Sequence, residues 1–196
     1  MNQTVRYLTH PQVLIEPNKP VPDWSLNDLG KARVTALAAS GSLTGTRHVI
    51  SSAEVKAVET ATPLADALGC SLAIRPRMHE NDRSATGFLP PREFEQVADQ
   101  FFAHPEDSVR GWEPAKTAQE RIVAEVKDCL RLFTSGGVLF VGHGGVGTLL
   151  FCALSGVAIS RKHDQGAGGG GCYFTFTGPW GKPDTGWQPL EDMIRR

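Results

Sequence analysis

The chain has 196 residues, of which 40% are hydrophobic, and a formal net charge of -1 at pH 7. This length and apolar content are enough for one domain with a buried core, and we expect a single domain over residues 1–196. The balanced charge excludes a global basic field of the kind that binds nucleic acid or an anionic membrane, so neither is expected as a partner.

The compartment is predicted from the cysteines and the apolar segments. The four cysteines form no C-x-x-C pair, which favours buried thiols over disulfides or metal ligands. The first residues, MNQTVRYLTH, lack the apolar core of a signal peptide. Residues 136–160 contain no Asp, Glu, Lys or Arg, but their many glycines and His143 favour a buried strand and helix over a membrane span. We therefore expect a cytoplasmic protein.

Strands alternate with helices in the first part of the chain. The pattern predicts a strand over 4–9, a loop over 14–23, a helix over 26–39, a strand over 49–50, a helix over 55–68 and a strand over 70–74. Ser25 is the expected N-cap of the first helix, and the pair Ser51-Ser52 that of the second. Gly41 and Gly69 are expected to end these helices.

Residues 75–116 interrupt this alternation with charged side chains, the Pro90-Pro91 pair and a helical stretch over 92–103. A substrate-covering insertion would lie here. After it the pattern predicts a long amphipathic helix from Thr117 to about 133, a strand over 138–141, a helix over 146–157, a flexible glycine loop over 168–171 and a strand over 172–177. Residues 178–196 give no clear prediction.

This alternation predicts an α/β fold, a three-layer sandwich with a mostly parallel central sheet and helices on both faces. His10, Ser51-Ser52 and His143 each follow a predicted strand, and the carboxyl ends of parallel strands meet at one edge. Next to His143, glycines let backbone amides approach a ligand at a helix N-terminus. The sequence therefore predicts an anion site at this edge.

The order of these motifs resembles the histidine phosphatase superfamily, also called phosphoglycerate mutase-like. In that family a strand ends in R-H-G-x-[ST], a second leads into S-S-x-L-x-R-A-x-Q-T-A, an acidic residue follows, and a later strand ends in S-H-G-G. The corresponding stretches here are LTHPQV with His10, SSAEVKAVETA over 51–61, MHEND with Glu80, and VGHGGV with His143. The resemblance covers residues 5 to about 156. It implies a phosphoglycerate mutase-like fold and phosphatase or mutase activity. Two arginines of the pattern are replaced, by Thr9 and Lys56.

The chemistry of these residues supports the resemblance. Phosphoryl transfer to an imidazole needs a neutral nitrogen, cations or N–H donors around the phosphoryl oxygens, and a proton donor for the leaving group. His10 is the candidate nucleophile, while His143 and Lys56 would hold the phosphoryl group together with amides near Gly144. Glu80 is the candidate general acid, with a pKa expected to be raised toward neutrality by an anionic substrate and an apolar wall. Asp82 is the alternative.

The missing arginine before His10 weakens the expected phosphate site. The Thr9 hydroxyl can still bind phosphate, but it offers one neutral donor where a guanidinium would give two charge-assisted bonds. Arg83, carried by the insertion next to Glu80, is the expected substitute and would close over the phosphate with that segment.

Other enzyme classes lack their motifs in this chain. There is no G-x-S-x-G nucleophile elbow, no P-loop and no H-x-x-x-H or H-E-x-x-H pair, so we expect neither a metal nor a cofactor. The favoured function is a metal-independent phosphatase that hydrolyses a phosphorylated small molecule or protein through a phosphohistidine on His10. The alternative is a degenerate, weakly active or non-catalytic member that binds a phosphorylated ligand. A phosphomutase is less favoured because the chain is short, and no oligomeric state is predicted.

Overall fold

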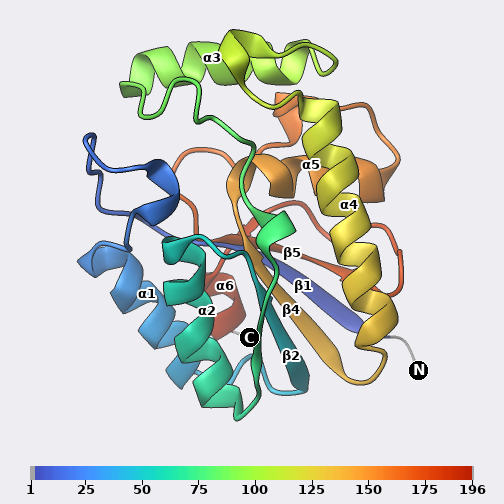
Figure 1. Cartoon of the computed structure of the whole chain (residues 1–196). Coiled ribbons are helices and arrows are strands. Elements are labelled where there is room, and N and C mark those ends of the chain that lie inside the picture. The colour runs from blue at the N-terminus through green and yellow to red at the C-terminus, as the bar shows by residue number, and fades with distance from the viewer. Residues whose placement is uncertain (1–2, 196) are drawn as a thin grey trace.

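The computed structural model describes residues 3–195, which form one six-stranded sheet between two layers of helices (Figure 1). The strand order is β3-β2-β4-β1-β5-β6. The strands are β1 (Thr4–Thr9), β2 (Thr46–Ser51), β3 (Leu72–Ile74), β4 (Gly137–Gly142), β5 (Cys172–Thr177) and β6 (Gln188–Pro189). The first four run parallel, whereas β5 is antiparallel to β1 and β6 is antiparallel to β5. The predicted three-layer α/β fold with a mostly parallel sheet is confirmed.

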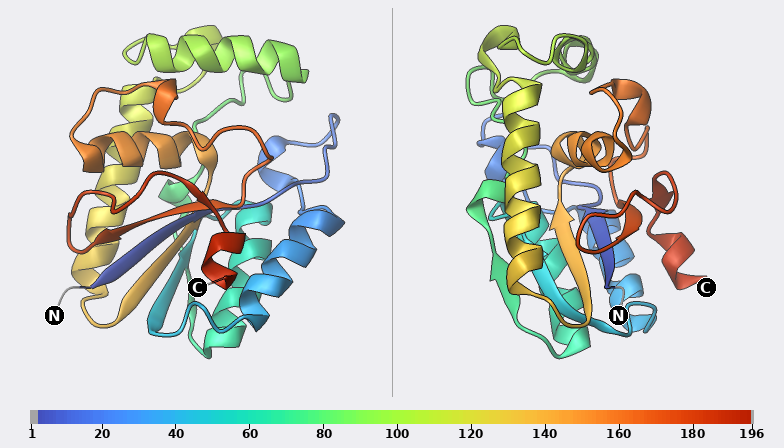
Figure 2. Two further views of the ribbon diagram at one scale, coloured as in Figure 1. Left: turned by 180° about the vertical axis from the view of Figure 1, so that it is seen from behind. Right: turned by 90° about the vertical axis from the view of Figure 1, so that its right-hand side faces the viewer.

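Helices cover both faces of the sheet, and one helix lies across its carboxyl edge. One face carries α1 (Asp28–Ala39), α2 (Val55–Leu68) and α6 (Glu191–Ile194), and the other carries α4 (Ala115–Leu132) and α5 (Gly144–Ser155). Helix α3 (Pro91–Ala103) lies above the carboxyl ends of the strands, at the top of Figure 1 and of both views in Figure 2. The short 3-10 turns are η1 (Val21–Asp23), η2 (Pro76–Met78), η3 (Val109–Gly111) and η4 (Arg161–His163).

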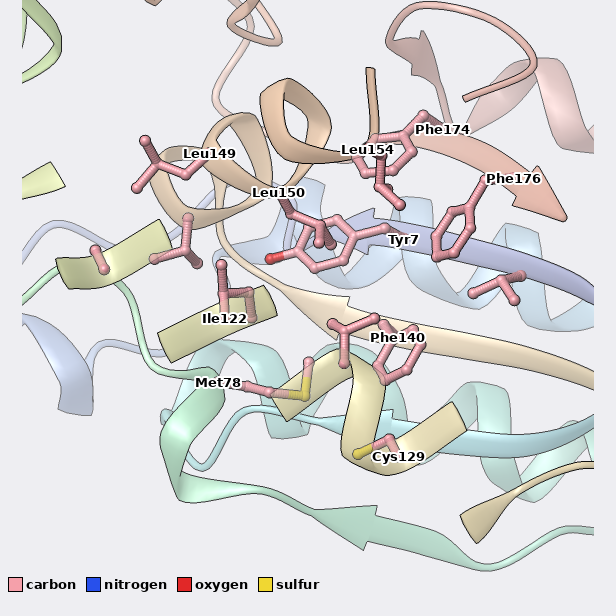
Figure 3. Close-up of a cluster of buried hydrophobic side chains, with 14 of the residues drawn as sticks. Tyr7, Met78, Ile122, Cys129, Phe140, Leu149, Leu150, Leu154, Phe174 and Phe176 are labelled. Carbon is pink, nitrogen blue, oxygen red and sulfur yellow. The ribbon is translucent and has the colours of Figure 1, made fainter. Parts of the chain in front are cut away.

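Each central strand divides its side chains between two cores. In β4, Val138 and Phe140 pack toward α4 and α5, and the residues between and after them pack toward α1 and α2. Tyr7 of β1 lies between Phe140 and Phe174 in the sheet register. Figure 3 shows these three aromatic rings together in the core on the α4 and α5 side. Burial on both faces explains why the central strands read as continuous apolar runs.

The two predicted N-caps are wrong. Helix α1 is capped by Asn27, whose side chain accepts the Gly30 N–H at 2.9 Å, and not by Ser25. Helix α2 has no side-chain cap: Ser51 still belongs to β2, and the Ser52 hydroxyl, which is bonded to His143, accepts the N–H of Glu54, the residue before the helix, at 3.3 Å. Gly69 ends α2 in the left-handed conformation, as predicted.

The first and last residues of the other helices and strands differ from the prediction by a few positions. Strand β2 begins earlier than predicted, β3 excludes Cys70, α4 begins at Ala115 rather than Thr117, and α5 begins directly after His143. The C-terminal tail, for which no element was predicted, holds β6 and α6, and its Trp187 packs on Phe174 with ring centroids 4.8 Å apart. Within the described residues no helix is long and apolar enough to cross a membrane.

Candidate active site

The carboxyl ends of β1, β2 and β4 meet at one edge of the sheet, as the sequence predicted. The N–H of His10 donates to the carbonyl of Gly142 at 3.0 Å, and the N–H of Ser52 donates to that of Val141 at 3.1 Å. The rings of His10 and His143 lie edge to face, with centroids 5.3 Å apart. The strand ends thus bring the two histidines together.

His10 is held in a form that can act as a nucleophile. Its Nδ1 lies 2.9 Å from the carbonyl oxygen of Pro11, and because a carbonyl only accepts, we assign the ring proton to Nδ1. Nε2 therefore carries the lone pair. Burial lowers the pKa of His10 to about 3, and a positive charge on His143 or Lys56 would oppose its protonation further. The imidazole is neutral at physiological pH.

His143 is fully buried beside His10. Its Nε2 lies 2.9 Å from the Ser52 hydroxyl and 3.5 Å from a carboxylate oxygen of Glu54. Burial lowers the pKa of His143 and so favours the neutral ring. Its Nδ1 is buried and has no hydrogen-bond partner within residues 3–195, and His143 is not among the residues that line the cavity next to His10.

Lys56 is paired with a carboxylate that the sequence analysis did not single out. Its Nζ lies 2.5 Å from Glu54 Oε2 and donates to the Val21 carbonyl at 2.8 Å. Burial alone would raise the pKa of Glu54, but His143, Lys56 and the N–H of Glu80 together lower it to about 2. Glu54 is thus ionised and neutralises Lys56. Lys56 is buried and is not among the residues that line the cavity next to His10.

Glu80 occupies the N-terminus of α5. Its carboxylate accepts the N–H of Gly145 at 3.0 Å and the N–H of Val146 at 2.9 Å. Burial raises its pKa, but His143, Arg83 and these amides outweigh burial, so the pKa of Glu80 is lowered. The expected upward shift is wrong here, because the carboxylate itself takes the amides that were expected to bind phosphate.

A cavity of about 790 Å³ opens next to His10. Glu80, Arg83 and Gly144 line it, so three more of the predicted residues share this space. The guanidinium of Arg83 lies 5.0 Å from the ring centroid of Phe94, and it has no ion-pair or hydrogen-bond partner within the part of the chain that the structure describes. Arg83 is therefore a cation available to a ligand.

Thr9 lies outside this cavity. It is fully buried, and its hydroxyl donates to Gln165 Oε1 at 2.7 Å and accepts the N–H of Cys172 at 3.0 Å. The hydroxyl thereby ties β1 to the start of β5. Gly144 packs against the same glutamine, since a Cβ on Gly144 would lie 2.3 Å from Gln165 Nε2.

The glycine loop also reaches the site. Gly170 has φ +85°, and a Cβ there would lie 2.1 Å from the carbonyl oxygen of His10. Its N-terminal neighbours along the chain include Asp164, which lines the cavity and accepts the Thr148 hydroxyl at 3.0 Å. Burial raises the pKa of Asp164.

Asp82, the alternative general acid, does not line the cavity next to His10. It is exposed, its pKa is lowered by the N–H of Ser84, and it lines a second cavity of about 720 Å³. Glu80, Asn81 and Arg83 line both cavities and so form the partition between them. Within residues 3–195 no group of three or more His, Cys, Asp or Glu could hold a metal ion.

Comparison with known proteins identifies the family of the chain. The model of the histidine phosphatase superfamily (branch 1) matches residues 17–170. The chain belongs to this superfamily. One curated relative, the probable phosphoglycerate mutase GpmB of Enterobacter sp. (strain 638), is 29% identical over 149 residues, which are 71% of this chain and 68% of the relative.

Solved structures with the same fold include two named phosphatases. A mycobacterial glucosyl-3-phosphoglycerate phosphatase in complex with inorganic phosphate has a TM-score of 0.76 and 18% identity, covering 96% of this chain and 99% of that one. Phosphoserine phosphatase from Entamoeba histolytica in complex with 3-phosphoglyceric acid has a TM-score of 0.75 and 16% identity, covering 95% and 96%. At these identities the two structures show a shared fold.

Proposed function

We propose that the protein is a phosphatase that hydrolyses a phosphomonoester, of a small molecule or a protein, through a phosphohistidine on His10. The observation that carries this proposal is the setting of His10: its Nδ1 lies against the Pro11 carbonyl, which leaves Nε2 with the lone pair of the neutral ring, and it lines a cavity beside Arg83, whose guanidinium has no ion-pair partner among residues 3–195. Membership of the superfamily and the named phosphatases among its structural neighbours support the same activity.

The proposed reaction has two steps. Nε2 of His10 attacks phosphorus, the bond from phosphorus to the ester oxygen breaks, and that oxygen takes a proton from Glu80. Water then attacks the phosphohistidine and gives a proton to the Glu80 carboxylate as the phosphorus–nitrogen bond breaks, so that His10 returns to its neutral form and Glu80 to its protonated form. The phosphate dianion beside Glu80 favours the protonated carboxyl group that the first step needs. It also competes with Glu80 for the amides of Gly145 and Val146.

The intermediate can be trapped directly. The enzyme is mixed with an aryl phosphate, quenched in alkali because phosphoimidazole hydrolyses in acid, digested and mapped by mass. We expect phosphate on His10 alone. Turnover with label on another residue, or with none, would contradict the proposed mechanism.

A second function is favoured by the two replaced arginines. The Thr9 hydroxyl is hydrogen-bonded to Gln165 and Cys172, and the charge of Lys56 is paired with that of Glu54. The phosphate site therefore has fewer free cations than the family pattern provides. A degenerate member would bind a phosphorylated ligand without turning it over. Vanadate binding without release of phosphate from any monoester would favour this alternative.

Replacing Arg83 by alanine is expected to weaken inhibition by vanadate about tenfold or more, since a charge-assisted bond to phosphate contributes about 1.5–3 kcal/mol. The exposed Arg92 of the same insertion does not line either cavity, so Arg92→Ala is the matched control. The measurement is the inhibition constant for both variants at one ionic strength. Equal constants in Arg83→Ala and the wild type would exclude Arg83 as a phosphate ligand.

A further inference from the structure

A buried ion pair, Glu54 and Lys56, lies beside His143 at the start of α2. Both side chains are almost fully buried, and Nζ of Lys56 lies 2.5 Å from Oε2 of Glu54. The other carboxylate oxygen, Oε1, lies 3.5 Å from Nε2 of His143. The family pattern S-S-x-L-x-R has leucine and arginine at these two positions, so both members of the pair depart from it. The replaced arginine is thus accompanied by a carboxylate that cancels the remaining cation.

Glu54 connects the groups that the proposed reaction uses. Besides bonding Lys56, its carboxylate accepts the backbone N–H of Glu80 at 2.8 Å. Its own N–H donates to the Ser52 hydroxyl at 3.3 Å, and that hydroxyl is bonded to His143. The charge of this carboxylate therefore acts on the general acid and on the neighbouring cations. Glu54 also lines the second cavity, together with these charged and titratable side chains: Lys19, His79, Glu80, Asp82 and Arg83.

The formal charges around the His10 cavity cancel among the residues that the structure describes. Three cations and three carboxylates line it: Arg83, Arg161, Lys162, Glu80, Glu95 and Asp164. Behind them the charge of Lys56 is cancelled by that of Glu54. A phosphomonoester dianion adds about two negative charges to this neutral set. Because buried charges are screened only weakly, uptake of a proton by one carboxylate would offset one of the added charges.

On the basis of the proposed function, we infer that Glu54 is a positioning residue that acts through Glu80: its negative charge makes the site bind a phosphomonoester dianion together with one proton from solvent, which Glu80 then donates to the leaving oxygen. In the free protein, the amides of Gly145 and Val146 help to keep the pKa of Glu80 low. Bound phosphate competes for these amides and adds negative charge, and both effects favour the protonated carboxyl group. Without the charge of Glu54, the unpaired Lys56 would take the place of this proton.

The test measures the binding of inorganic phosphate and the accompanying proton uptake in the wild type and in Glu54→Gln. Titration calorimetry is carried out at about pH 8, where phosphate is mainly the dianion, in two buffers with different enthalpies of protonation. We expect the wild type to take up about one proton per phosphate bound. The variant should take up about half a proton or less and should bind phosphate about tenfold more tightly, whereas a carboxylate with only a structural role would lose affinity when replaced.

Two further variants isolate the ion pair. In Glu54→Gln/Lys56→Met both charges are absent, so phosphate affinity should return to near the wild-type value. Glu59→Gln is the matched control, since Glu59 lies on the same helix, accepts the N–H of Leu26 at 2.7 Å and lines neither cavity. Its phosphate affinity and proton uptake should equal those of the wild type. A gain of affinity that persists in the double variant would overturn the role of the pair.

Steady-state kinetics on an alkyl phosphate give a second measurement. If phosphate binds to Glu54→Gln without its proton, both KM and kcat should fall, each by about tenfold, because binding tightens while less Glu80 is protonated in the complex. Equal or weaker phosphate binding in Glu54→Gln, or no proton uptake in the wild type, would overturn the inference. Phosphate release from the alkyl ester would then leave the proposed function intact. Binding of phosphate without its release from any monoester would overturn the proposed function.

Discussion

Replacing His10 by alanine is expected to lower kcat by about a thousandfold or more, because the covalent step has no other nucleophile in the proposed mechanism. His10 is the histidine that lines the cavity, whereas His143 lies buried beside it. The measurement is phosphate release from an aryl phosphate under saturating conditions. His104→Ala is the control, since His104 is an exposed residue that follows α3.

Further measurements on the His10→Ala variant separate a loss of chemistry from a loss of structure. The His10→Ala protein should keep its cooperative thermal transition and still bind vanadate through Arg83, although more weakly. It should also give no acid-labile label in the alkaline quench. Retention of more than about a tenth of wild-type kcat would exclude a phosphohistidine on His10 from the main pathway.

The architecture could be predicted because the sheet is buried on both faces. The continuous apolar run over 138–141 predicts a buried strand, the helical spacing of apolar residues over 55–68 predicts a helix, and burial in the folded chain reinforces both. The N-cap of α1 could not be predicted from the sequence, since Ser25 and Asn27 are both good N-cap residues two positions apart. Only the approach of α1 to the preceding loop, where Asn27 donates its N–H to the Gln12 carbonyl, selects between them.

The site was predictable where it depends on strand ends, which is true of His10 and His143. The partners of these residues depend on side-chain contacts that no spacing rule gives, such as Glu54 bonding both Lys56 and the N–H of Glu80. Asp164 was missed for a topological reason. Because β5 is antiparallel to β1, the segment before it lies at the carboxyl edge of the parallel strands, and a sheet expected to be mostly parallel gave no reason to place that segment there.

Replacing Glu80 by glutamine is expected to lower kcat/KM for an alkyl phosphate by about 10²-fold or more, the usual contribution of a general acid. An aryl phosphate with a strongly acidic phenol needs no proton on its leaving oxygen, so its kcat/KM should change little. Measuring both esters separates proton donation from positioning. Equal losses on the two would mean that Glu80 only orients the substrate, and Asp164→Asn would then be the variant to measure, since burial raises the pKa of Asp164 in the same cavity.

The pH dependence of kcat/KM is an independent test of Glu80 as the general acid. The productive free enzyme has a neutral His10, which exists above a pKa of about 3, and a protonated Glu80, whose pKa lies below its usual 4.5. As pH rises above the pKa of Glu80, the protonated fraction falls about tenfold per unit, so kcat/KM for the alkyl ester should decrease toward neutral and alkaline pH. The ratio of alkyl to activated aryl kcat/KM cancels the ionisation of His10, which acts on both esters, and the difference between the two phosphates' own ionisations is the same for both proteins. We expect this ratio to fall more steeply with increasing pH in the wild type than in Glu80→Gln; equal slopes in the two proteins would assign the proton to another group.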